Sequence, residues 1–128
     1  MGQGYLLDTN TIVDYCGGKL PEVAMLQMHQ IVDKGFSVSP VVKIEVLGFS
    51  GTPTDMQKLE GLINLAGMLY INDEVINTSI NLRKSKKIKL GDAIIAATAI
   101  ANGRDLITRN TKDFNNISGL TVIDPYLM

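Results

Sequence analysis

Four acidic residues from distant parts of the chain stand at positions where side chains could meet and do chemistry. Asp8 directly follows a short apolar run, Glu45 lies about one turn into an expected helix, Asp92 opens an apolar helix, and Asp113 follows a later strand by a short loop. Carboxylates that converge at one edge of a sheet repel one another unless a cation neutralises them. Mg²⁺ or Mn²⁺ takes oxygen ligands, keeps several waters and can activate one of them for attack on a phosphate. These residue types predict metal-assisted phosphodiester hydrolysis.

Each acid, taken alone, also has an ordinary structural explanation. Asp92 at a helix start is favoured by the helix dipole, and Asp113 could cap the turn that follows it. Glu45 could be a solvated surface residue. Asp8 is harder to explain in this way, because it lies at the mouth of a strand and is followed by further polar groups.

Polar and basic residues surround these acids in the sequence. Asn10, Thr108 and Asn110 could orient ligands or bound waters, although turns and caps use the same residue types. Arg109 and Lys112 flank the same loop, where they could contact phosphates or be exposed to solvent. We expect the first three to support the acids and the last two to bind substrate.

The elements that must position these residues alternate along the chain. Helices are expected over residues 21–34, 53–66, 73–84 and 92–102, with a further helix carrying Glu45, and strands over 5–7, 36–38, 68–71, 106–107 and 121–123. Parallel strands need crossover connections and bury both faces. The pattern predicts a single domain over residues 1–128, an α/β fold with a central parallel sheet of about five strands in a three-layer α/β/α sandwich. In such a sheet, ligands bind beyond the carboxyl ends of the strands, where the strand order reverses.

Composition limits the partners. The formal net charge is −1, so a nucleic acid would have to be held by local basic patches. One dense basic run is present, and phosphate binding and simple solvation both explain it: Lys84, Lys86, Lys87 and Lys89. The single cysteine, the absence of a signal peptide and the lack of a long apolar run predict a cytoplasmic protein that does not associate with membranes.

Four segments in order along the chain resemble the PIN-domain family, and in particular the toxin ribonucleases of VapBC-type toxin-antitoxin modules. They are YLLDTNTIVD at 5–14, SPVVKIEVLG at 39–48, LGDAIIAA at 90–97 and DLITRNTKDFNNI at 105–117. A lone DTN or GDA would be a weak signal, but the four together span nearly the whole chain. Relatives often carry an Asp where this chain has Asn110, so either Asn110 or Asp113 could complete the acidic set.

The resemblance implies a Mg²⁺- or Mn²⁺-dependent endoribonuclease that acts on single-stranded RNA, with metal ligands at Asp8, Glu45 and Asp92 and catalytic help from Asp113. It also implies a homodimer and an antitoxin whose C-terminal tail enters the acidic groove. We expect dimer surface on the helices at 21–34 and 53–66, around Met25, Met28, Met56 and Leu59.

Other functions remain open at this stage. A stand-alone RNA-processing nuclease of the same family would carry the same residues, as would a PIN fold kept only for binding. A haloacid-dehalogenase-like phosphatase also opens with a strand and an Asp, but Asn10 stands where its acid/base Asp is needed. A phosphate-accepting receiver domain would need an Asp after the third strand, where this chain has Asn72.

Overall fold

A computed structural model describes residues 4–128 and contains one five-stranded parallel sheet in the order β3-β2-β1-β4-β5. The strands are β1 (Tyr5–Leu7), β2 (Ser37–Val38), β3 (Gly67–Met68), β4 (Asp105–Ile107) and β5 (Val122–Ile123). All four pairings are parallel, which confirms the predicted sheet. The third strand is shorter than expected. After the Leu69 N–H donates to the Val38 carbonyl (3.0 Å), the exposed Tyr70 and Ile71 leave the sheet and lead into the next helix.

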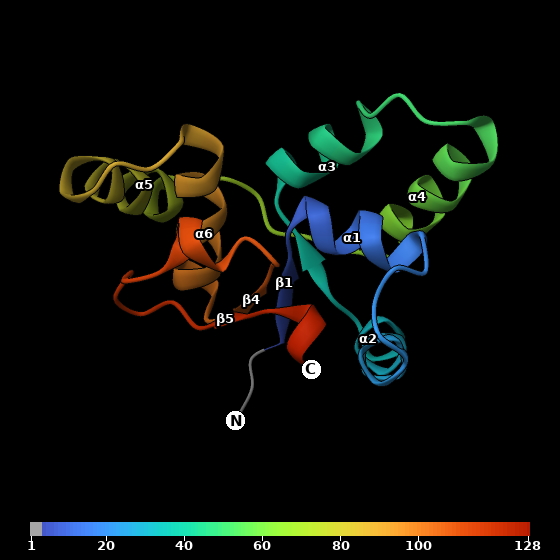
Figure 1. Cartoon of the computed structure of the whole chain (residues 1–128). Coiled ribbons are helices and arrows are strands. Elements are labelled where there is room, and N and C mark those ends of the chain that lie inside the picture. Colours follow the sequence, from blue (N-terminus) through green and yellow to red (C-terminus); the bar gives the residue numbers. More distant parts are fainter. Residues whose placement is uncertain (1–3) are drawn as a thin grey trace.

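Within residues 4–128, six α-helices cover the sheet. They are α1 (Thr9–Cys16), α2 (Glu22–Lys34), α3 (Pro40–Leu47), α4 (Pro53–Leu65), α5 (Asp73–Ser85) and α6 (Leu90–Asn102), and two short 3-10 helices follow, η1 (Thr111–Phe114) and η2 (Pro125–Leu127). In Figure 1, α5 and α6 lie to the left of β1, whereas α1, α2 and α4 lie to its right. Within residues 4–128 no helix is both long and apolar enough to cross a membrane.

Local residue chemistry sets most helix boundaries. The side chains of Thr52 and Asn72 accept hydrogen bonds from backbone N–H groups in the first turns of α4 and α5, as their capping roles predict. Gly103 ends α6 in the left-handed conformation (φ 63°) that glycine adopts without strain. α6 begins at Leu90, two residues ahead of the expected start at Asp92, one end each of α2, α4 and α5 differs from expectation by one residue, and the sequence pattern did not predict α1.

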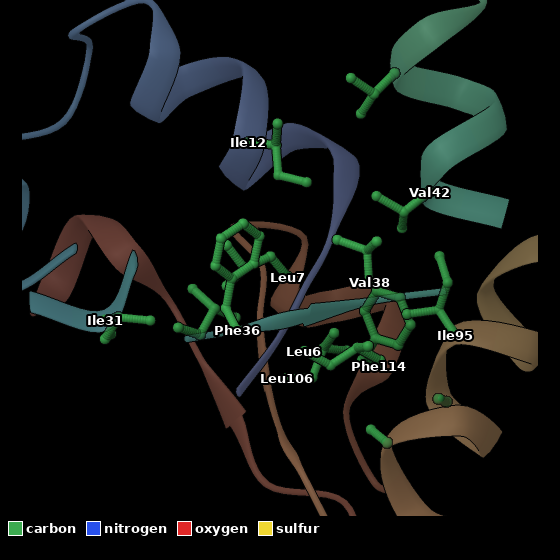
Figure 2. Packing of buried hydrophobic residues seen from close by; sticks show 14 of the residues in the cluster. Leu6, Leu7, Ile12, Ile31, Phe36, Val38, Val42, Ile95, Leu106 and Phe114 are labelled. Atoms are coloured by element: carbon green, nitrogen blue, oxygen red, sulfur yellow. The ribbon is translucent and has the colours of Figure 1, made fainter. Parts of the chain in front are cut away.

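The hydrophobic core lies between the sheet and the helices. Figure 2 shows Leu6, Val38 and Leu106 of neighbouring strands packed with Phe114, and all four side chains are almost fully buried. Met28 and Leu59 also belong to this core, at 0% and 3% exposure. Their apolar area is already buried within one chain, so these two residues are not dimer surface, whereas Met25 and Met56 are half-buried and dimer surface on α2 and α4 stays a prediction.

The strand order reverses between β1 and β4. Chain connections run outward from β1 through β2 to β3, and the chain then returns to β4 on the other side of β1. The last residues of the two strands, Leu7 and Ile107, are in register. Whatever follows them therefore meets at the carboxyl edge of the sheet, the position at which open α/β sheets bind ligands.

Candidate active site

Asp8 occupies the crevice between the carboxyl ends of β1 and β4. Its N–H donates to the Ile107 carbonyl at 3.0 Å, and the Thr11 hydroxyl donates to the same carbonyl at 2.9 Å. One carboxylate oxygen of Asp8 accepts from the Thr9 N–H at 2.8 Å and so caps α1. The end of the strand and the start of the helix together fix this carboxylate, which is only 5% exposed.

The second carboxylate oxygen of Asp8 is held by neutral donors. Oδ2 accepts from the Thr108 hydroxyl at 2.8 Å and from Asn10 Nδ2 at 3.3 Å. No ion pair to Asp8 is present in residues 4–128. Burial raises the pKa of Asp8 and nearby Glu45 adds to the rise, against the lowering effect of the hydrogen bonds. The site thus holds a desolvated carboxylate without a countercharge.

Thr108 is the centre of this polar network. Its hydroxyl oxygen accepts from Asn10 Nδ2 at 3.2 Å and from the Asn110 backbone N–H at 3.1 Å. Asn10 Oδ1 in turn accepts from the Arg109 N–H at 3.1 Å. The structure therefore brings Asn10 and Thr108 together beside Asp8, while Asn110 joins the network through its backbone.

Asp92 lies in the first turn of α6 and is subject to the field of the other acids. Burial is the largest cause of the raised pKa of Asp92, and the charges of Asp8 and Asp113 raise this pKa further. Lys89 lowers it, and Glu45 makes the smallest contribution to the rise. Glu45 itself is exposed on α3, where its Oε1 accepts from the Thr9 hydroxyl at 2.6 Å. Asp92 thus lies within electrostatic reach of the three other predicted acids, and Asp8 within reach of Glu45.

The donor chemistry suits a hard divalent cation. The candidate ligands are all oxygens, and their mutual repulsion is relieved by positive charge. Among residues 4–128, however, no three Asp, Glu, His or Cys side chains form a group that could hold one metal ion. The prediction that Asp8, Glu45 and Asp92 share one cation stays a prediction. A small number of protein ligands is compatible with Mg²⁺, which keeps several of its waters.

Arg109, expected to bind phosphate, has a partner within the chain. Its Nη1 lies 2.7 Å from Oδ2 of Asp14, which also accepts from the Tyr126 hydroxyl at 2.9 Å. Asp14 is 2% exposed, whereas the Arg109 side chain is 49% exposed. Lys112 is exposed on η1, next to Asp113.

Two polar contacts were missed from the sequence. Thr9 orients Glu45, and Asp14 anchors the loop after β4 through Arg109. The available signal was helical spacing. Once Asp8 is recognised as the cap of a helix, Thr11 and Asp14 fall three residues apart on one face, which turns out to be the buried face.

Comparison with known proteins gives consistent matches. The family model described as PIN domain matches residues 5–120. Ribonuclease VapC1 of Rickettsia felis is 30% identical, over 94% of this chain and 95% of its own length. A toxin-antitoxin complex from Klebsiella pneumoniae contains a chain that is 30% identical, with a TM-score of 0.75 over 96% of this chain and 98% of that one. DNA-bound VapBC from Salmonella typhimurium superposes with a TM-score of 0.79, at 23% identity, over 98% of this chain and 99% of that one, and so shares the fold.

Proposed function

The chain belongs to the PIN-domain family as a relative of the VapC ribonucleases, and we propose that it is a metal-dependent endoribonuclease that hydrolyses single-stranded RNA. The observation that carries this proposal is the uncompensated negative charge at the β1–β4 crevice. Asp8 is buried there and is paired with no basic side chain of residues 4–128, and three other carboxylates raise the pKa of Asp92. Residues 1–128 would form one nuclease domain.

In this proposal Asp8, Glu45 and Asp92 hold Mg²⁺ or Mn²⁺, and Asp113 or Asn110 completes the site at its rim. When bound, the ion supplies an activated water and stabilises charge that develops on the scissile phosphate. Thr108 and Asn10 hold the Asp8 carboxylate in place, and Thr9 does the same for Glu45.

Substrate contacts are assigned to Arg109 and Lys112. Half of the Arg109 side chain is exposed although one of its nitrogens is paired with Asp14, so the remaining donors can face a phosphate. Lys112 is exposed beside Asp113. Both would contact the backbone near the scissile bond, where they offset the repulsion between the acids and the RNA.

Cleavage assays test the proposal directly. Single-stranded RNA should be cut in the presence of Mg²⁺ or Mn²⁺, and EDTA should abolish the cutting. Asp92→Asn should lower cleavage by orders of magnitude, because it removes a charged ligand, whereas Asp55→Asn on the exposed start of α4 should cut normally. Full activity of folded Asp92→Asn protein, or activity that survives EDTA, would end the assignment.

The biological setting follows from the relatives. We propose that the chain is the toxin of a toxin-antitoxin pair, inhibited by a cognate antitoxin, since complexes of that kind are among the similar structures. A stand-alone RNA-processing nuclease is the alternative, and a small upstream reading frame encoding a DNA-binding protein distinguishes the two. Membership of the PIN-domain family overturns the phosphatase alternative. The cytoplasmic location stays a prediction.

The dimer expected from the resemblance needs a surface other than Met28 and Leu59. We propose that a second copy of the chain covers the apolar groove between α5 and α6. Its volume is about 580 Å³, and Ile76, Ile80 and Leu90 line it at 45%, 46% and 61% exposure. Ile80→Glu should convert a dimer to a monomer by light scattering, whereas Leu65→Glu on α4 should not. A wild-type monomer at micromolar concentration would contradict the proposal.

A further inference from the structure

A second groove opens directly beside the acidic site, and its walls are strongly basic. Its volume is about 720 Å³. The charged and polar residues that line it are Arg83, Lys86, Lys87, Lys89, Lys112 and Asn115, together with Asp92 and Asp113. Positive charge is thus concentrated next to two of the proposed catalytic acids, in a protein whose net charge is −1.

The basic residues of this groove have two different tasks. Arg83 Nη1 donates to the Ile88 carbonyl at 2.8 Å, and Lys86 Nζ donates to the Asn115 carbonyl at 2.7 Å. These two contacts fasten the loop after α5 to the groove walls. Lys87, Lys89 and Lys112 are exposed, and the described residues 4–128 contain no ion pair to any of them. Their charges are free to meet a ligand.

A buried residue fixes the backbone that carries two of these lysines. Ile88 is 9% exposed and packs into the core, so the exposed residues on either side of it, Lys87 and Lys89, are held at the surface by a buried anchor. Lys89 immediately precedes α6, whose N-terminus has no side-chain cap. The positive end of that helix dipole adds to the field of the groove.

We propose that this groove binds the backbone phosphates of the RNA on one side of the scissile bond. The inference rests on the proposed nuclease function, because an RNA strand whose scissile phosphate lies at the acidic site must continue over the surface beside it, and this groove shares Asp92 and Asp113 with that site. The groove begins at Asp92 and Asp113, and Asp8 is not part of its lining. The groove therefore extends from Asp92 and Asp113 away from Asp8, and its lysines would contact the strand on that side of the scissile bond.

RNA binding without cleavage isolates the groove from catalysis. In EDTA, the affinity for a single-stranded RNA should fall linearly with salt on a logarithmic scale, and each lysine that contacts a phosphate should contribute about 0.7 to the slope. The variant with Lys87→Ala and Lys112→Ala should therefore have a slope smaller by about 1.4. Lys89 is left unchanged because it acts on the pKa of Asp92.

The matched control carries Lys34→Ala and Lys58→Ala, which remove the same charge elsewhere. Lys34 lies beside Gly4 and Tyr5 at the opposite end of β1, and Lys58 lies on α4. The control should keep the wild-type salt slope. Equal loss of slope in both double variants would overturn the proposal. An acidic peptide that displaces labelled RNA as effectively as unlabelled RNA does would also overturn it.

Substrate trimming tests the one-sided placement. In Mg²⁺, removal of nucleotides from one side of the cleavage site should lower kcat/KM much more than removal from the other side. The variant with Lys87→Ala and Lys112→Ala should lose this asymmetry. Equal dependence on both sides in the wild type would overturn the inference while leaving the nuclease function intact, and absence of any cleavage would overturn the function but not the binding result.

Discussion

Two buried aspartates near the N-terminus, Asp8 and Asp14, have opposite electrostatic surroundings. Asp14 is 2% exposed and its carboxylate meets the Arg109 guanidinium at 2.7 Å and the Tyr126 hydroxyl at 2.9 Å. Asp8 is 5% exposed, yet its hydrogen-bond donors are all neutral. A charge removed from water is tolerated when it is paired, and an unpaired one lacks that compensation. Asp14 therefore has its countercharge within the chain, whereas residues 4–128 provide none for Asp8.

The difference separates a structural acid from a candidate catalytic one on the same helix. The Asp14 contacts join α1 to the loop after β4 and to η2 near the C-terminus. The Asp8 contacts join the same helix to Thr108, but they leave the charge itself uncompensated. The motif resemblance predicts a catalytic role for Asp8, and the ion pair with Arg109 favours a structural role for Asp14.

Asp8→Asn is expected to have the largest effect, and this effect is a loss of RNA cleavage. Loss of the charge at the site should lower cleavage by more than about a hundredfold, the upper end for residues that merely support a metal ligand. The folded structure should persist, because the amide oxygen can still accept one of the hydrogen bonds made to Asp8. Asp14→Asn, compared as folded protein below its melting temperature, should retain most of its cleavage. The reverse pattern would contradict the division of roles.

Thr108→Val should lower cleavage by about 10- to 100-fold, since the isosteric side chain removes the donor that positions Asp8. Thr108→Ser keeps the hydroxyl and should restore most of the activity. The Mg²⁺ concentration for half-maximal cleavage should rise in the valine variant and not in the serine variant. An equal loss in both variants would show that Thr108 acts only through packing.

Asp14→Asn should lower the free energy of unfolding by about 1–3 kcal/mol, between the values for exposed and buried ion pairs, because Arg109 is half exposed. Tyr126→Phe removes only the second contact to Asp14 and should cost about 1 kcal/mol. Denaturant unfolding in EDTA measures both. A stability for Asp14→Asn equal to that of the wild type would remove the structural role.

The smallest expected effect is a loss of stability with rising pH, which added divalent cations should offset. Because the pKa of Asp92 is raised above the ordinary aspartate value of 3.8, the unfolded chain loses this proton first, and stability falls as the pH rises from about that value through the folded pKa. In EDTA, wild type should therefore lose stability relative to Asp92→Asn over this range. Added Mg²⁺ should raise the melting temperature of the wild type at pH 7 and have little effect on the variant. Parallel curves for the two proteins would contradict the repulsion at the site.

Sequence patterns identified the candidate acids but did not show which buried acid is paired with a basic side chain. Asp8, Glu45, Asp92 and Asp113 follow from strand ends and motif order, and in the structure the three other acids each raise the pKa of Asp92. Whether they hold one ion stays a prediction. Arg109 illustrates the limit: its sequence neighbours suggested a phosphate contact, whereas pairing of β1 with β4 places it against Asp14 of α1.

Local chemistry alone determined the alternation of strands and helices, the caps at Thr52 and Asn72, and the end of α6 at Gly103. Those features depend on residues within one turn of each other. Tertiary structure decided that Met28 is core and that the basic groove is built from α5, the loop before α6 and η1. It also decided that Asp14, and not Asp8, receives the arginine. The reason is that burial and charge pairing depend on which distant segments the strand order brings together, and no local pattern carries that information.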